Sequence, residues 1–269
     1  TPIQWLNKEQ VWSKIPSSIQ QCIYSFEVSQ FVSSTNDVVS ESLVKQNQSG
    51  IVCITEMQEA GRGRRGREWL SPPAGNFYGS IGWIFNDGFS VIEGLSLAVG
   101  VALIKAMESV GARGLQLKWP NDVLHQGKKL AGILIEITGD VGGSCQVVVG
   151  VGVNLQLPES IKQQITQPVT DLYSVCDYAV DRQKITAAIV TELITLLNGY
   201  GKTGFSEWQN DWLSYDAFKN MPVLIVGMQE PLNGIARGVD EQGNLLLEVE
   251  GEMMKIYGGE VSLRQVLSN

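Results

Sequence analysis

The sequence contains a single histidine, His125, among 269 residues, and this scarcity excludes several kinds of chemistry. Metal sites that need several histidine ligands are impossible, and a Ser-His-Asp triad could be built only around His125. His125 lies in the stretch LHQGKK, which is typical of a turn, so we interpret it as an exposed loop residue.

Cysteine is also scarce, and the four cysteines are far apart in the sequence: Cys22, Cys53, Cys145 and Cys176. None lies within three residues of another, which excludes a CxxC metal or redox pair. No secretory segment is recognisable at the N-terminus, so we expect reduced thiols in a cytoplasmic protein. The longest apolar run near the middle, 94–104, is shorter than the roughly 20 residues that cross a bilayer, so we expect no membrane partner.

Positive charge is in deficit, with 20 basic against 28 acidic residues and a net charge of -8. This balance argues against a protein that holds nucleic acid by its general charge. Any anion that the protein binds must therefore be met by a local cluster. The stretch GRGRRGREW, 61–69, is such a cluster, with four arginines: Arg62, Arg64, Arg65 and Arg67.

The arginine loop can hold carboxylate or phosphate oxygens in bidentate fashion, and its glycines let the backbone approach a ligand. Because its charges repel one another, we expect it to be mobile when empty and to become ordered on an anionic ligand. The alternatives are a solvated basic loop or an RNA-binding RGG patch. RGG segments, however, occur as repeats in disordered tails, whereas this stretch lies between two predicted strands.

The order of elements predicts an α+β fold. Capping groups in SSTN, 33–36, predict a helix, and GIVCITE and NFYGSIGWIF predict strands on either side of the arginine loop. Residues 91–110 predict a long central helix, followed by strands whose short turns favour antiparallel pairing, and then by helices over 182–200 and 205–215. From about Asn220, short strands between turns predict a small β-barrel. The expected domains are 1–218 and 219–269.

Two further stretches hold candidate chemical groups. In KWPNDV, 118–123, the Trp-Pro pair predicts a rigid bend that presents Lys118, Asn121 and Asp122. Asp122 could hold a Mg²⁺ that is carried on phosphates, although an Asx-turn in a hairpin explains the stretch equally well. Lys129 begins the apolar strand KLAGILIE beside small residues, where the alternative is a solvated lysine.

The order of the motifs is more specific than any one of them. SSTN, QEAGRGRRGREW, KWPND, KLAGIL, GVGVNL and GGEVSLR follow one another between Ser33 and Arg264, and this order resembles biotin protein ligases. The resemblance implies a mixed-sheet catalytic domain, related to that of lipoate ligases, and a C-terminal SH3-like barrel. It also implies activation of biotin by ATP to biotinyl-5′-AMP, and transfer to a lysine of the biotin carboxyl carrier protein of acetyl-CoA carboxylase.

The same resemblance implies roles for individual residues. Biotin is expected to lie against Ser34, Thr35, Asn36, Gln58, Gly61, Arg62, Gly63, Arg64, Lys129 and Gly132. ATP and the adenylate are expected to lie against Arg64, Arg65, Arg67, Trp69, Lys118, Asn121, Asp122 and Asn154, with Trp69 as the wall for the adenine. Arg64, Lys118 and Lys129 are the expected catalytic residues, and Asp122 is the expected contact of Mg²⁺. Glu260 and Arg264 are expected to tie the barrel to the site.

Bifunctional members of this family carry a DNA-binding domain before the STN motif, and only 33 residues precede Ser34. We therefore expect no repressor role and no nucleic-acid partner, while a homodimer through the catalytic sheet is possible. Residues 1–30 fit no motif, although 4–16 predict a packing helix. The nearest rival is a lipoate or octanoyl ligase, against which the arginine loop and KWPND argue.

Overall fold

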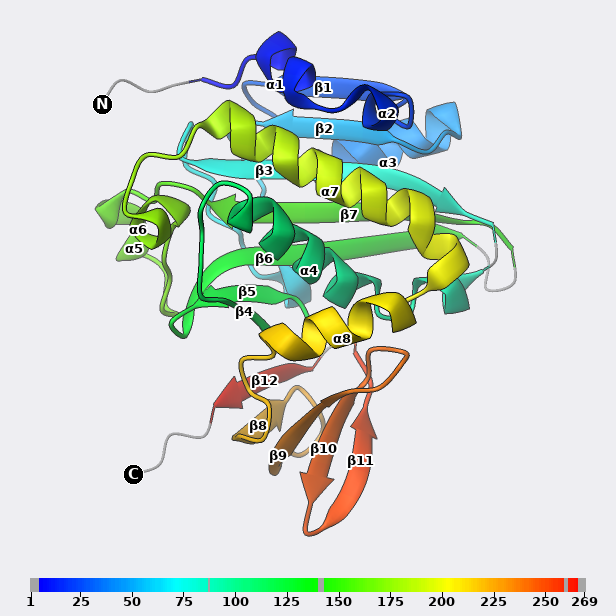
Figure 1. Cartoon of the computed structure of the whole chain (residues 1–269), viewed down its shortest axis with the longest axis vertical. Coiled ribbons are helices and arrows are strands. Elements are labelled where there is room, and N and C mark those ends of the chain that lie inside the picture. The colour runs from blue at the N-terminus through cyan, green and yellow to red at the C-terminus, as the bar shows by residue number, and fades with distance from the viewer. Residues whose placement is uncertain (1–4, 87, 140–142, 259–260, 266–269) are drawn as a thin grey trace.

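The computed structural model describes residues 5–86, 88–139, 143–258 and 261–265. A mixed sheet of seven strands forms the larger part of the protein, in the order β1-β2-β3-β7-β6-β5-β4 (Figure 1). Its strands are β1 (Ser25–Ser29), β2 (Ile51–Thr55), β3 (Asn76–Phe85), β4 (Leu115–Lys118), β5 (Asp122–His125), β6 (Lys128–Gly139) and β7 (Cys145–Asn154). Among these strands only β1 and β2 pair in parallel, and the other neighbours are antiparallel. The short turns between β4, β5 and β6 predicted the antiparallel pairing of those three strands.

Helices cover both faces of this sheet. One face carries α4 (Leu95–Glu108), α7 (Arg182–Thr203) and α8 (Ser206–Tyr215), and α3 (Thr35–Gln46) lies behind the sheet (Figure 1). Strand β2 shows why both faces are apolar: Val52 and Ile54 join the main core, whereas Ile51 and Cys53 pack with α3. Such a strand reads as a continuous hydrophobic run, because both of its faces are buried.

The central helix begins four residues later than predicted. A 3₁₀ turn, η2 (Phe89–Ile92), precedes α4, and Gly94 adopts φ 71°, so the α-helix begins only at Leu95. The stretch 90–108 is longer than the apolar run seen in the sequence, and by length and composition it could cross a membrane. Within the protein 67% of it is buried, as the core helix of a globular fold also is.

The N-terminal segment, to which no motif could be assigned, packs against the catalytic fold. The predicted helix is present as α1 (Lys8–Lys14), whose first turn is capped by Asn7, and α2 (Ser17–Gln20) follows it. Asn7 N–H donates to Gln183 Oε1 at 3.1 Å and Gln183 Nε2 donates to Trp5 O at 2.9 Å, which joins this segment to α7. Two short helices, α5 (Glu159–Lys162) and α6 (Leu172–Cys176), lie between β7 and α7.

The C-terminal part is a second, antiparallel sheet in the order β11-β10-β9-β8-β12. Its strands are β8 (Pro222–Val226), β9 (Leu232–Val239), β10 (Leu245–Val249), β11 (Glu252–Ile256) and β12 (Ser262–Gln265). In the described residues no pairing joins β11 to β12, so the predicted barrel is an open sheet here. The sheet docks where Trp119 Nε1 donates to Gly243 O at 3.0 Å and Gln209 Nε2 to Val239 O at 2.9 Å.

Candidate active site

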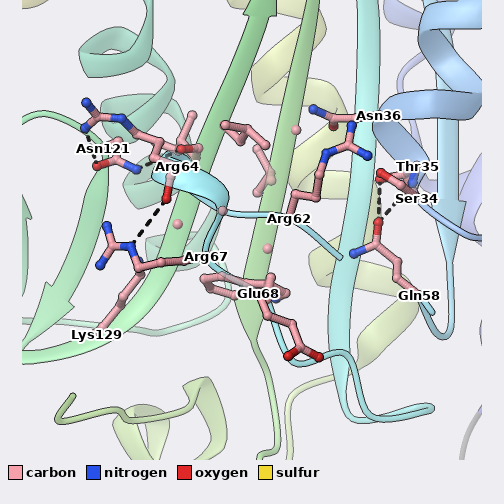
Figure 2. Close-up of a pocket in the computed structure, with 18 of the residues that line it drawn as sticks. Ser34, Thr35, Asn36, Gln58, Arg62, Arg64, Arg67, Glu68, Asn121 and Lys129 are labelled. Carbon is pink, nitrogen blue, oxygen red and sulfur yellow. Dashed lines mark hydrogen bonds between the residues drawn. The ribbon is translucent and has the colours of Figure 1, made fainter. Parts of the chain in front are cut away.

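A cavity of about 90 Å³ opens where the N-terminus of α3 and the arginine loop meet β6 and β7 (Figure 2). It is lined by Ser34, Thr35, Asn36, Gln58, Arg62, Gly63, Arg64, Arg67, Glu68, Trp69, Asn121, Lys129, Gly132, Ile133, Leu134, Gly150, Val151, Gly152 and Gln167. Most of the predicted site residues are therefore brought together from four separate stretches of the sequence. Predicted residues outside this lining are Gly61, Arg65, Lys118, Asp122 and Asn154.

Glycines form the floor of the cavity, and their neighbours explain why. Gly132 and Gly152 face each other on β6 and β7, and a Cβ would lie 2.8 Å and 2.4 Å, respectively, from the Trp69 ring. A Cβ at Gly150 would lie 2.2 Å from Asn36 Oδ1. The Trp69 indole and the Asn36 amide can therefore pack directly against the backbone of the sheet only because these three positions are glycines.

The ring of Trp69 packs against this floor of glycines. The Lys129 ammonium lies 5.3 Å from the centroid of the Trp69 ring, within the range of a cation–π contact. The indole Nε1 of Trp69 is buried and has no hydrogen-bond partner in the part of the chain that the structure describes. Buried indole N–H groups normally find an acceptor, so this donor suits a ligand with a polar atom.

One end of the cavity is a neutral polar network at the start of α3. Gln58 Oε1 accepts from Thr35 N–H at 2.9 Å, the Thr35 and Ser80 hydroxyls lie 2.7 Å apart, and Ser80 donates to Asn36 Oδ1 at 2.6 Å. The cap of α3 thus differs from the prediction. Ser34 occupies the N-cap position without a capping side-chain hydrogen bond, and Gln58 meets the first helical amide instead. Ser80 lies on β3, and the sequence offered no sign of its role.

Arg62 has acidic partners that the sequence analysis also missed. Its guanidinium donates to both oxygens of Asp37 at 2.8 and 2.6 Å, and to Glu136 at 3.2 and 3.4 Å. This pairing raises the pKa of Arg62, and the hydrogen bond from Arg62 lowers the pKa of Asp37. The assumption that the loop is unneutralised without a ligand is therefore wrong for Arg62.

The arginine loop is a hydrogen-bonded hairpin. Gly63 N–H donates to Arg67 O at 2.7 Å and Trp69 N–H donates to Gly61 O at 2.9 Å, around a single 3₁₀ turn, η1 (Arg64–Gly66). Arg65 has φ 62°, a left-handed conformation that is uncommon for a residue with a side chain and is often found at functional sites. Its side chain is exposed and lines an open groove beside the cavity.

The other end of the cavity is strongly cationic. Lys129 Nζ lies 2.7 Å from Asp122 Oδ1, and both side chains are nearly buried. Burial lowers the pKa of Lys118, and so do the nearby charges of Lys129, Arg264 and Arg67, while Asp122 opposes the shift. Lys118 thus lies near three other cations and one carboxylate, which leaves a local excess of positive charge that suits a phosphate chain.

Arg64 connects this end to the C-terminal sheet. Its guanidinium donates to Asn121 Oδ1 at 3.1 Å (Figure 2). It also donates to the backbone oxygen of Val261 at 3.4 Å, and Asn121 in turn donates to Ile133 O at 2.9 Å. The expected tie through Glu260 lies outside the described residues. Arg264 lies on β12 close enough to influence the pKa of Lys118.

Two other residues of the sequence analysis lie outside the cavity lining. Asn154 is buried and donates to Thr170 O at 3.1 Å, and its expected place beside the nucleotide stays a prediction. His125 is the last residue of β5 and is half-buried, so it is not an exposed loop residue.

Comparisons with known proteins agree on one family. Residues 28–154 match the "Biotin/lipoate A/B protein ligase family" and residues 222–264 match the "Biotin protein ligase C terminal domain". The bifunctional ligase/repressor BirA of Escherichia coli is 37% identical over 98% of this chain and 79% of its own length. The biotin–[acetyl-CoA-carboxylase] ligase of Paracoccus denitrificans is 34% identical over 77% of this chain and 88% of its own.

The fold gives the same answer. The biotin protein ligase from Aquifex aeolicus, solved in complex with biotin and ATP, superposes with a TM-score of 0.76 and 29% identity, over 91% of this chain and all of that one. The two matched domains, the relatives that align along most of the chain and the shared fold all point to the same family. The chain belongs to the biotin protein ligase family.

Proposed function

We propose that the cavity activates biotin with ATP and that the protein transfers the biotinyl group to a lysine of the carboxyl carrier protein of acetyl-CoA carboxylase. The observation that carries this proposal is the division of the cavity into two ends. The neutral end offers hydroxyl and amide groups of Ser34, Thr35, Asn36 and Gln58, which suit the uncharged ureido ring of biotin. The cationic end suits the biotin carboxylate and the phosphates of ATP.

In the first step an oxygen of the biotin carboxylate attacks the α-phosphorus of ATP, and the bond from that phosphorus to the bridging oxygen breaks as pyrophosphate leaves. Two anions must meet, so the barrier is largely electrostatic. Lys129, Arg64 and Lys118 supply preorganised positive charge where negative charge gathers. No general base is needed, because a carboxylate is ionised at neutral pH. This fits a chain with one histidine that lies outside the cavity.

Magnesium would arrive as part of the substrate MgATP. Among the described residues no three acidic, histidine or cysteine side chains gather into a metal site, and Asp122 is the one carboxylate beside the cation cluster. One carboxylate fits Mg²⁺, which is usually held by one or two carboxylates together with phosphate oxygens. The ion supplies neutralisation of the phosphate charge, and Asp122 would share its own charge between that ion and Lys129.

In the second step the neutral amine of the carrier lysine attacks the acyl carbon of biotinyl-AMP. The bond from that carbon to the phosphate oxygen breaks, AMP leaves, and the amine loses a proton. The hairpin of the arginine loop covers the cavity, so it would limit access of water to the mixed anhydride between the two steps. Trp69 would contact the adenylate from the glycine floor, with its indole N–H available to a ligand acceptor.

The decisive experiment is to incubate the protein with biotin, MgATP and a biotin-acceptor domain and to weigh the acceptor by mass spectrometry. A mass increase of one biotinyl group, dependent on ATP, is expected. A lipoate ligase is the alternative that the broader family description leaves open, and the C-terminal domain match disfavours it. Lipoate in place of biotin should leave the acceptor unmodified, and biotin but not lipoate should raise the melting temperature.

We further propose a cytoplasmic location and a capacity to form a homodimer. All four cysteines are free, and burial, helped by Glu27, raises the pKa of Cys53 to about 12, which supports inert reduced thiols. The pairing of β5 with β6 reaches from Lys128 to Gly132, whereas β6 continues to Gly139. That remaining edge could accept a strand of a second copy, which analytical ultracentrifugation with and without biotin would test. The absence of a nucleic-acid partner stays a prediction.

A further inference from the structure

Two carboxylates surround the guanidinium of Arg62. Asp37 binds it in a bidentate pair, and Glu136 lies at 3.2 Å on the same Nη2 atom. These partners are on different elements, because Asp37 is in the first turn of α3 and Glu136 is on β6. The side chain therefore reaches from the loop to both the helix and the strand that border the cavity.

Acidic groups outnumber basic ones around Arg62, whereas basic groups outnumber acidic ones at the cationic end of the cavity. One cation meets two carboxylates at Arg62, whereas Asp122 pairs with Lys129 near Lys118, which in turn lies near Arg67 and Arg264. The charge of this guanidinium is already balanced by Asp37, and its bidentate face is occupied, so it has fewer donors to offer an incoming phosphate. Arg62 is thus unsuited to the charge neutralisation that the nucleotide end performs.

Glu136 also contacts the neutral end of the cavity. Its Oε2 accepts from Asn36 Nδ2 at 2.8 Å, and Asn36 Oδ1 accepts from Ser80 at 2.6 Å. One carboxylate therefore joins the arginine loop to the side chains that face the ureido ring. Hydrogen bonds that share a carboxylate in this way fix the two groups relative to each other.

We propose that Asp37 and Glu136 are positioning residues that hold Arg62 as a strap across the cavity, so that this strap governs retention of the acyl-adenylate while the cations around Asp122 govern its formation. The proposal rests on the proposed function of the cavity. Neither carboxylate touches the reacting atoms. Their effect is exerted through Arg62 and, for Glu136, through Asn36.

The test compares Asp37→Asn and Glu136→Gln with the parent protein. Each is allowed to form biotinyl-AMP from labelled biotin and MgATP, and the loss of the bound label is then followed by rapid gel filtration. A half-exposed ion pair is worth up to about 1 kcal/mol, so release should be about fivefold faster in either variant. The KM for ATP in pyrophosphate exchange should stay unchanged, and Asp37→Glu should restore much of the lifetime.

A matched control is available on the opposite face of the sheet. Asp211 pairs with Lys105 at 2.7 Å with side-chain exposures of 48% and 41%, against 46% and 38% for Asp37 and Arg62. Asp211→Asn should therefore leave the lifetime of the bound adenylate unchanged. A parent-like lifetime in both Asp37→Asn and Glu136→Gln would overturn the proposal, as would a rise in the KM for ATP without faster release.

The proposal and the function on which it rests fail differently. If the parent protein forms no labelled adenylate from biotin and MgATP, the proposed function is wrong. If the parent forms and retains it and the two variants retain it equally well, only the strap is wrong. Circular dichroism and melting curves of both variants, matched to those of Asp211→Asn, would confirm that a shorter lifetime comes from a folded protein.

Discussion

Replacing Lys129 by methionine removes the ammonium that lies between Asp122 and the ring of Trp69. The nearly buried Lys129–Asp122 pair has an N–O distance of 2.7 Å and side-chain exposures of 13% and 14%. Methionine keeps most of the aliphatic length, so the change is mainly one of charge. If Lys129 stabilises the developing charge on the α-phosphate, losing one preorganised donor should lower kcat for biotin-dependent ATP–pyrophosphate exchange by about 100- to 1,000-fold, or about 2.7–4 kcal/mol.

The same change also has a cost in stability, which must be separated from its effect on the chemistry. Removing one partner of an isolated buried pair costs about 3–5 kcal/mol. Here Lys118 remains near Asp122, and Arg67 and Arg264 lie near Lys118, so we expect a smaller loss of about 1–3 kcal/mol. At about 2–4 °C per kcal/mol, the melting temperature should fall by roughly 2–12 °C.

A second variant separates the two effects. Asp122→Asn combined with Lys129→Met leaves no buried carboxylate without its partner, so it should recover part of the melting temperature while exchange stays low. Exchange is measured at saturating biotin and MgATP, with the folded fraction checked by calorimetry. Exchange by folded Lys129→Met within threefold of the parent rate would refute the assignment of Lys129.

Three further predictions concern other parts of the site. Arg64→Gly loses the hydrogen bonds to Asn121 and to Val261 O, so it should release biotinyl-AMP and label bystander lysines; a parent-like lifetime of the bound adenylate would contradict this. Arg182→Met breaks the buried pair with Glu56 (2.7 Å), which should lower the free energy of unfolding by about 3–5 kcal/mol and the melting temperature by roughly 6–20 °C. Calorimetry should show partial recovery when Glu56→Gln is added, and a fall of less than about 2 °C in the single variant would contradict this prediction. Gly150→Ala places a methyl group 2.2 Å from Asn36 Oδ1, so the KM for biotin should rise by roughly 5- to 150-fold, from about 1–3 kcal/mol, while the KM for ATP stays unchanged.

The sequence predicted most of the elements because their signals are local. Strand β3 coincides with the predicted NFYGSIGWIF, and α7 and α8 lie within a few residues of their predicted ranges, because side-chain periodicity and flanking turn residues define them. The start of α4 was misplaced because it depends on packing: Gly94 turns the chain against Phe205, a residue more than a hundred positions later. Apolar periodicity contains no information about that contact.

Most of the polar residues that line the cavity were predicted from motifs, whereas their supporting partners were not. The prediction also missed part of the lining: Glu68, Ile133, Leu134, Gly150, Val151, Gly152 and Gln167. Asp37, Ser80 and Glu136 lie on three elements, and the register of the sheet, with Ser80 opposite Gly150 and Glu136 opposite Val148, brings the two strand residues to the side where α3 packs. In sequence, Glu136 is one acidic residue in an apolar strand and looks like a solvent-facing position. Its pairing with Arg62 spans 74 residues and requires the arginine loop to be placed first.

The arginine loop shows how a glycine-rich, charged segment obtains a defined shape. At its roots, Ala74 N–H donates to Glu56 O at 3.2 Å, and Arg182 donates to the Asn76 carbonyl at 3.0 Å and to the Glu56 carboxylate at 2.7 Å. In its middle, Arg62 is held by Asp37 beside the neutral end of the cavity, and Arg64 is held by the backbone of Val261 beside the C-terminal sheet. Each anchor is an ionic or polar contact to a different element, so the shape of the loop depends on the complete fold. Loss of either middle anchor should therefore weaken retention of the intermediate without unfolding the protein. Loss of the Arg182–Glu56 pair should weaken retention and also destabilise the fold.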